Sequence, residues 1–157
     1  MTDAPSFDLD AAHKHFAGAC FNACWALIDV RERTPEQEEE MLRLATASHY
    51  HWTQRANYGP KEASVAAWQL SRVYALIGEG SLARRFGRRS LEVLEGSDVG
   101  AFFVGYAHEA LARAASVLGD AAALAMHTAA CKAAAESLDD ADQRSWLLGD
   151  LSTVPAI

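Results

Sequence analysis

The sequence has no long apolar run and few cysteines, and each shortage excludes a class of protein. Half of the 157 residues are apolar. Charged residues interrupt them, so the chain lacks the run of about 18 apolar residues that would span a bilayer. The three cysteines are an odd number, and residues 1–5 carry no basic region followed by an apolar block of the kind that directs export. We therefore expect reduced thiols, no disulfide framework and a cytoplasmic location.

Basic charge is also scarce, and lysine is especially rare. The net charge is -7 at pH 7, which repels nucleic acids and anionic membranes at long range. Neither is expected as a partner. Arginine outnumbers lysine 11 to 3 and the chain has 32 alanines, a bias typical of GC-rich bacterial genomes.

Strand patterns are missing as well, because β-branched residues are scattered and do not alternate over five or six positions. Apolar residues instead recur at three- and four-residue spacing between Gly, Pro and capping residues. This spacing predicts seven helices, over residues 8–30, 35–55, 61–77, 81–94, 101–118, 121–138 and 141–151.

The clearest helix start follows Arg33. Thr34 can cap, Pro35 takes the first helical position, and Gln37 completes a capping box. Carboxylates in this first turn are favoured by the helix dipole, so the acidic run 36–40 is interpreted as a solvated helix start.

Two segments, 68–95 and 108–136, share one layout: an apolar helix, a glycine followed by an acidic residue, then a second helix rich in alanine and leucine. The turn glycines, Gly78 and Gly119, lie 41 positions apart. A period in this range is typical of stacked helical hairpins, because one hairpin cannot bury its own apolar stripe.

The segment 68–95 resembles a tetratricopeptide repeat. The matching positions are Leu70, Ser71, Tyr74, Gly78, Ala83 and Ser90-Leu91-Glu92. The next hairpin resembles the same repeat in degenerate form, through Leu111, Ala112, Ala115, Gly119 and either Leu124 or Ala125. Segments 33–36, 48–52 and 68–74 are also similar to those of small actinobacterial repeat proteins of uncharacterised function. The resemblance implies a fold and no activity.

These observations predict an all-α protein. We expect a single domain, 1–157, built as a right-handed stack of three antiparallel hairpins at about 8–56, 60–95 and 100–138. A short helix at 141–151 would cap the open end of this tetratricopeptide-like solenoid, since repeat stacks need a polar end.

Metal-binding and catalytic residues are sparse. Cys20 and Cys24 stand one helical turn apart, as do His127 and Cys131, so two such pairs could supply four zinc ligands. We favour inert core thiols, because no short-loop C-x-x-C unit is present and buried cysteine packs as a small hydrophobe.

Histidines spaced by two residues, 13 with 15 and 49 with 51, point to opposite helix faces and cannot chelate as helical pairs. His51 is expected to close the end of its helix or to reach the neighbouring hairpin, with proton transfer as the less favoured role. No catalytic triad, phosphate-binding glycine loop or H-E-x-x-H motif occurs.

Two clusters could bind a partner. Arg84, Arg85, Arg88 and Arg89 could hold a phosphate, although we favour a solvated face. In the repeat register, the inner groove carries Trp68, Arg72, Tyr106, Glu109 and Arg113. Aromatic side chains beside arginines and a carboxylate are typical of recognition surfaces. Glu109 and Arg113 could equally form an i,i+4 ion pair.

The favoured hypothesis is a non-enzymatic binding module without a cofactor, whose groove receives a peptide segment, a partner protein or a second copy of the chain. Its expected contact residues are Trp68, Arg72, Tyr106, Glu109, Arg113 and His51. The alternative is a small-ligand-binding protein or small enzyme with a pocket in the same groove, where His51, Glu109 or Tyr106 would transfer protons. The third hypothesis is the Cys/His metal site.

Overall fold

A computed structural model describes residues 6–157, and all regular structure in this range is helical. The expectation drawn from residues 1–5 lies outside the described range. The all-α prediction is confirmed, and among the described residues no helix combines the length and apolar character needed to cross a membrane. The helices are α1 (Leu9–Ile28), α2 (Pro35–Thr53), α3 (Pro60–Leu76), α4 (Gly80–Glu92), α5 (Ala101–Leu118), α6 (Ala121–Glu136) and α7 (Ala141–Ser152).

The helices divide into two compact units. Unit 1 is Met1–Gly59, whose described part holds α1 and α2, and unit 2 is Pro60–Ile157, which holds α3 to α7. The boundary lies in the loop where the sequence predicts the end of the first hairpin.

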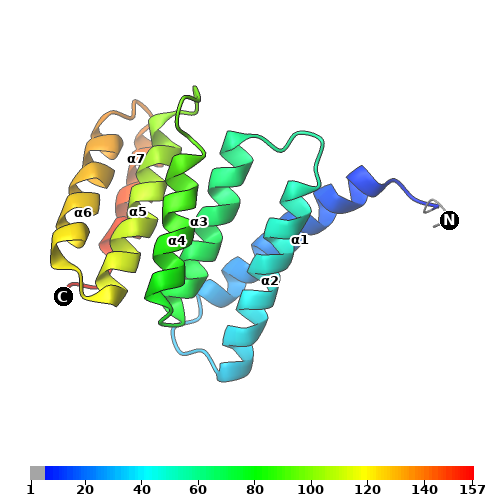
Figure 1. Cartoon of the computed structure of the whole chain (residues 1–157), viewed down its shortest axis with the longest axis horizontal. Helices are drawn as coiled ribbons and strands as arrows, with labels where there is room; N and C mark the ends of the chain where they lie inside the picture. The colour runs from blue at the N-terminus through cyan, green and yellow to red at the C-terminus, as the bar shows by residue number, and fades with distance from the viewer. Residues whose placement is uncertain (1–5) are drawn as a thin grey trace. The chain divides into compact units, whose positions relative to one another are not determined.

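Unit 1 is an antiparallel helical hairpin (Figure 1). The capping box at Thr34 and Gln37 is present, with the Thr34 hydroxyl accepting from the Gln37 N–H at 3.3 Å and the Gln37 side chain accepting from the Thr34 N–H at 2.9 Å. Small residues let the two helices approach, and the buried Ser48 hydroxyl donates to the Ala17 carbonyl at 2.9 Å. The other buried residues of the two helices are small except for Met41 and Ile28, so the helices pack closely.

Helix α1 ends at Ile28, and α2, α4 and α6 likewise end two residues before their predicted ends. At the end of α1 the Arg33 Nη1 donates to the carbonyls of Leu27, Ile28 and Val30 at 3.4, 3.2 and 2.6 Å. A cation at a helix C-terminus supplies donors to its last carbonyls and complements the helix dipole.

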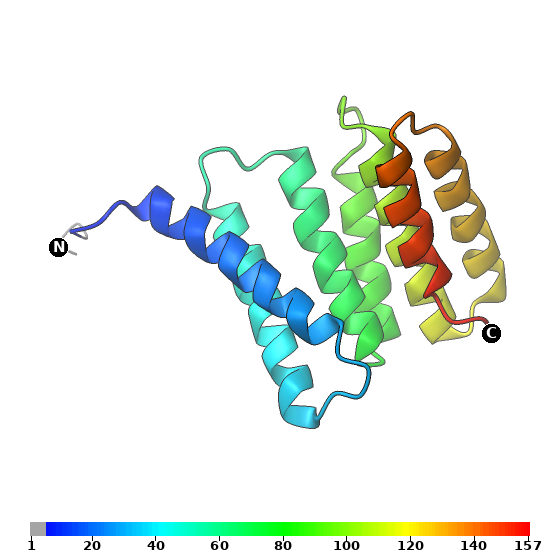
Figure 2. The same cartoon turned by 180° about the vertical axis from the view of Figure 1, so that it is seen from behind.

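In unit 2, each helix packs on the next one along the chain (Figure 1). In addition, α5 packs on both α3 and α7. Figure 2 shows α7 lying against α5, beside α6. Helix α5 is thus covered by α3, α4, α6 and α7, which accounts for its unbroken buried stretch from Glu109 to Ser116.

The two glycine turns of the sequence repeat adopt one geometry. Gly78 and Gly119 have φ of 83° and 68°, in the left-handed region that favours glycine. In both turns the next residue donates its N–H back five positions, from Glu79 to Tyr74 at 2.8 Å and from Asp120 to Ala115 at 2.9 Å. These bonds are those of a Schellman motif, which satisfies the last carbonyls of α3 and α5.

The repeat resemblance pairs Tyr74 on the first helix of a hairpin with Ala83 on the second, and these helices are α3 and α4. Ala83 is fully buried in a cluster with Ala75 and Ala114, and Tyr74 packs against this cluster. The Tyr74 ring also stacks on Phe86 of α4, with centroids 5.5 Å apart.

Helix α7 packs along α5 because α5 has a glycine at the contact. A Cβ on Gly105 would stand 2.4 Å from Cδ2 of Leu147, which is fully buried. Leu147 and Leu151 join a buried cluster with residues of α5 and α6. The short last helix therefore belongs to the core of unit 2.

Candidate functional site

Three of the six predicted contact residues donate hydrogen bonds to the carboxylate of a fourth, Glu109, on the face that α3 and α5 share. Glu109 has no exposed surface and accepts four hydrogen bonds. Its Oε2 accepts from the Trp68 indole N–H at 3.0 Å. Its Oε1 accepts from Arg72 Nη1 at 2.8 Å and from Arg113 Nε and Nη2 at 2.9 and 2.6 Å. We call Trp68, Arg72, Tyr106, Glu109 and Arg113 the inner-face cluster.

The last turn of α7 and the residues after it complete the contacts of Arg113. Its Nη2 donates to the Asp150 carbonyl at 3.1 Å and to Thr153 Oγ1 at 2.8 Å, and its Nη1 donates to the Thr153 carbonyl at 3.3 Å. Burial lowers the pKa of Arg113, and the negative charge of Glu109 opposes that shift. Since an arginine remains charged in proteins, the Glu109 carboxylate is the counter-charge that makes this burial tolerable.

Asp150 ties the fifth residue into the same cluster. Its Oδ2 accepts from the Tyr106 hydroxyl at 2.9 Å, and its Oδ1 lies 3.6 Å from Arg72 Nη2. Burial raises the pKa of Tyr106, and the nearby Asp150 charge raises it further. The phenol thus stays protonated at neutral pH and acts as a hydrogen-bond donor.

Both arginines are paired within the chain. Arg72 and Arg113 each bind Glu109, and for Arg113 this is the i,i+4 ion pair that the sequence left open. Arg72 and Arg113 are 7% and 5% exposed, and Glu109 is inaccessible. A ligand therefore reaches only the aromatic members of the cluster, Trp68 and Tyr106, which are half-buried.

The sequence analysis missed Asp150 and Thr153. A usable signal is present, because Trp68, Glu109 and Asp150 succeed one another at intervals of 41 residues, the period of the turn glycines. Continuing the repeat past residue 138 would have placed Asp150 opposite Glu109.

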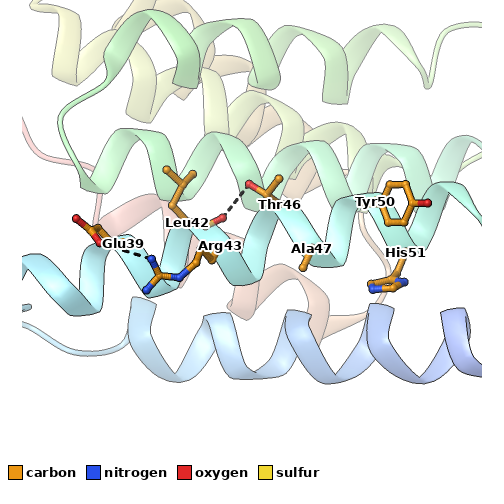
Figure 3. Close-up of a pocket in the computed structure, with 7 residues that line it drawn as sticks. All are labelled: Glu39, Leu42, Arg43, Thr46, Ala47, Tyr50 and His51. Carbon is orange, nitrogen blue, oxygen red and sulfur yellow. Dashed lines mark hydrogen bonds and ion pairs between the residues drawn. The ribbon is translucent and has the colours of Figure 1, made fainter.

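The sixth predicted residue, His51, lies in unit 1, in the last turn of α2, near the helix end that it was expected to close. Its Nδ1 lies 2.9 Å from Nδ1 of His13 on α1. His51 also lines an open hollow of about 690 Å³ on α2, shown in Figure 3. The other lining residues are Glu39, Leu42, Arg43, Thr46, Ala47 and Tyr50.

The four candidate zinc ligands are not brought together within either unit. Cys20 and Cys24 belong to α1 of unit 1, and His127 and Cys131 to α6 of unit 2. Among the described residues no group of three or more His, Cys, Asp or Glu side chains is placed to hold a metal ion. Burial raises the pKa of both Cys24 and Cys131 to about 12, which keeps these thiols protonated.

The arginines of α4 lie away from the inner-face cluster. Arg85, Arg88 and Arg89 are exposed and Arg84 is half-buried. Burial lowers the pKa of His127 on α6, and the charge of Arg88 lowers it further, so Arg88 lies close enough to act on this histidine.

Comparisons with protein-family models, with curated proteins and with solved structures gave no match. The function is therefore argued from the geometry.

Proposed function

We propose that this chain is a non-enzymatic binding module of the tetratricopeptide-like helical-repeat type, which contacts a peptide segment of a partner through the aromatic side of its inner-face cluster. The observation that carries the proposal is a rigid aromatic pair. The rings of Trp68 and Tyr106 meet edge to face with centroids 4.8 Å apart. Each polar atom is already bonded, to Glu109 and to Asp150 respectively.

Such a pair suits binding for a physical reason. Large rings that are fixed before a partner arrives lose little conformational entropy on contact, so their buried area contributes fully to affinity. Phe102 extends the pair, since its ring lies edge to face with Tyr106 at 5.0 Å. The three rings favour apolar side chains of a partner over a carboxylate.

The same cluster argues against proton-transfer chemistry there. A general acid or base must reach the atom that it protonates or deprotonates. Glu109 is inaccessible and already accepts four hydrogen bonds, and the raised pKa of Tyr106 disfavours its ionisation. The cluster therefore supports binding better than the alternative of a small enzyme in the same groove.

The test compares partner capture by the wild-type chain, by Trp68→Ala and by Trp146→Ala. Trp146 is 61% exposed on α7 and offers a matched tryptophan outside the cluster. Proteins from the source cells are quantified on each immobilised chain, and sedimentation measures self-association. Circular dichroism confirms that each variant keeps its helices.

We expect at least one partner, or a second copy of the chain, to be lost by Trp68→Ala and kept by Trp146→Ala. In a calorimetric titration the loss should be about 2 kcal/mol or more for Trp68→Ala. The double change Arg84→Ala with Arg88→Ala should cost less than about 1 kcal/mol, because exposed charges are easily screened. The reverse ranking would place binding on the arginine face of α4.

A further inference from the structure

Two histidines of unit 1 meet across the hairpin, and the sequence gives no direct sign of this contact. His13 on α1 and His51 on α2 are 38 positions apart, and their Nδ1 atoms are separated by 2.9 Å. Aromatic rings surround the pair: Phe16 lies 5.4 Å from His51, and Tyr50 lies 5.5 Å from His51 and 6.2 Å from His13, measured between centroids. Phe16 and Tyr50 are themselves 48% and 56% exposed, so the pair lies near the surface of the hairpin.

One side of the pair is accessible. His51 and Tyr50 line the hollow on α2, and Figure 3 shows His51 pointing from α2 towards α1. His13 and His51 are each only partly buried. The hollow therefore gives access to the His51 side of the pair.

The spacing of the nitrogen atoms suits a shared metal ion. Imidazole nitrogens bind Zn²⁺ at about 2.0–2.1 Å, and two such bonds to atoms 2.9 Å apart subtend an angle of about 90° at the ion. Cu²⁺ and Ni²⁺ prefer that angle in square-planar and tetragonal sites. The neutral imidazole that donates within the pair can move its proton from Nδ1 to Nε2, which leaves both Nδ1 lone pairs for the metal with no net loss of a proton.

A second histidine pair provides a comparison. His108 on α5 and His127 on α6 bring their Nδ1 atoms to 3.0 Å, nearly the same separation. Burial lowers the pKa of His127, the charge of Arg88 lowers it further, and the charge of Asp120 opposes this shift. Burial also lowers the pKa of His51, and His13 lowers it further. The charged residues that line the hollow beside His51 are Glu39 and Arg43, which form an ion pair with each other.

We propose that His13 and His51 form a two-histidine binding site for a divalent transition metal, of the class Zn²⁺, Ni²⁺ or Cu²⁺, on the hairpin of unit 1. Two protein ligands leave the other coordination positions to water or to a small donor molecule in the hollow. The site is independent of the proposed partner surface in unit 2, so either proposal can fail without the other.

The test uses each metal ion alone as the probe, with the full chain at neutral pH. Calorimetry measures affinity and stoichiometry for the wild type, for His13→Gln and for His51→Gln. The chain supplies matched controls in His15→Gln and His49→Gln, because each lies two positions from a member of the pair on another side of its helix. His108→Gln tests the second pair.

A second measurement needs no substitution. Nuclear magnetic resonance of ¹⁵N-labelled imidazoles in the wild-type chain identifies which histidines shift when Zn²⁺ is added. This readout remains decisive if either substitution at the pair unfolds the hairpin.

We expect saturable binding of one ion per chain, shifts at His13 and His51, and an affinity at least about tenfold weaker in either variant of the pair. Affinity should also fall on acidification, because protons compete for the same nitrogens. The proposal is overturned by the absence of saturable binding, by shifts centred on His108 and His127, or by an equal loss of affinity in the His15 and His49 controls.

Discussion

Removing the carboxylate of Glu109 should destabilise unit 2 more than any other single change in the inner-face cluster. In Glu109→Ala, Arg72 and Arg113 remain buried, with side chains 8% and 5% exposed, and lose their shared counter-charge. Breaking a buried ion pair from one side typically costs 3–5 kcal/mol, since the remaining charge is poorly solvated. Asp150 and Thr153 still contact the arginines, so we expect about 3 kcal/mol.

The assay is urea unfolding followed by far-ultraviolet circular dichroism. Glu136→Ala is the control, because Glu136 is exposed at the end of α6 and its loss should change the free energy of unfolding by no more than about 0.5 kcal/mol. Glu109→Gln should lie between the two, since it keeps the shape and acceptor oxygen of the side chain but not its charge. If Glu109→Ala comes within about 1 kcal/mol of the control, the arginines are better solvated than the structure indicates.

Three further changes test the packing and the histidines. Ala83→Leu should overpack the fully buried contact between α3, α4 and α5 and cost about 1–3 kcal/mol, whereas an unchanged urea midpoint would refute the repeat register. Gly105→Ala should cost a similar amount because its Cβ would overlap a leucine of α7. Gly18→Ala should stabilise the folded chain by about 0.5–1 kcal/mol, since no atom lies within 4 Å of the added Cβ. Equal effects of the two changes on the melting temperature would contradict this. Burial lowers the folded-state pKa of His108 and His127 below 6.5, so the unfolded chain binds more protons near that pH. The free energy of unfolding should therefore fall as the pH drops through this range. Replacing both histidines by Gln should make the urea midpoint depend less on pH.

The sequence predicts the helices well because their signals are local. The capping box at Thr34 and the turn glycines Gly78 and Gly119 fix helix ends through bonds within a few residues. Helices α1, α2, α4 and α6 each end two residues before the predicted end. At α1 the Arg33 side chain reaches back to three carbonyls. Such a cap depends on the course of the loop between α1 and α2, which the spacing of apolar residues does not predict.

The candidate site is predicted only where the repeat extends. The 41-residue period relates Trp68 to Glu109, and these two side chains are hydrogen-bonded. The repeat does not extend to His51. The contact of His51 with His13 depends on how α1 and α2 align across their hairpin. The two-residue spacing of His49 and His51 shows only that they point to opposite sides of one helix.

Burial is the property that the residue pattern could not supply. Aromatic side chains beside arginines and a carboxylate describe a recognition surface and an internal ion cluster equally well. What separates the two is whether another helix covers the face. Here α7 brings Asp150 and Thr153 onto Arg113, and its Leu147 packs where α5 has Gly105. A helix expected to close the end of the stack instead provides the last partners of the central charges. Asp150 also accepts the hydrogen bond of the Tyr106 hydroxyl. The residue that helps to bury the arginines therefore also fixes the Tyr106 ring on the proposed partner surface.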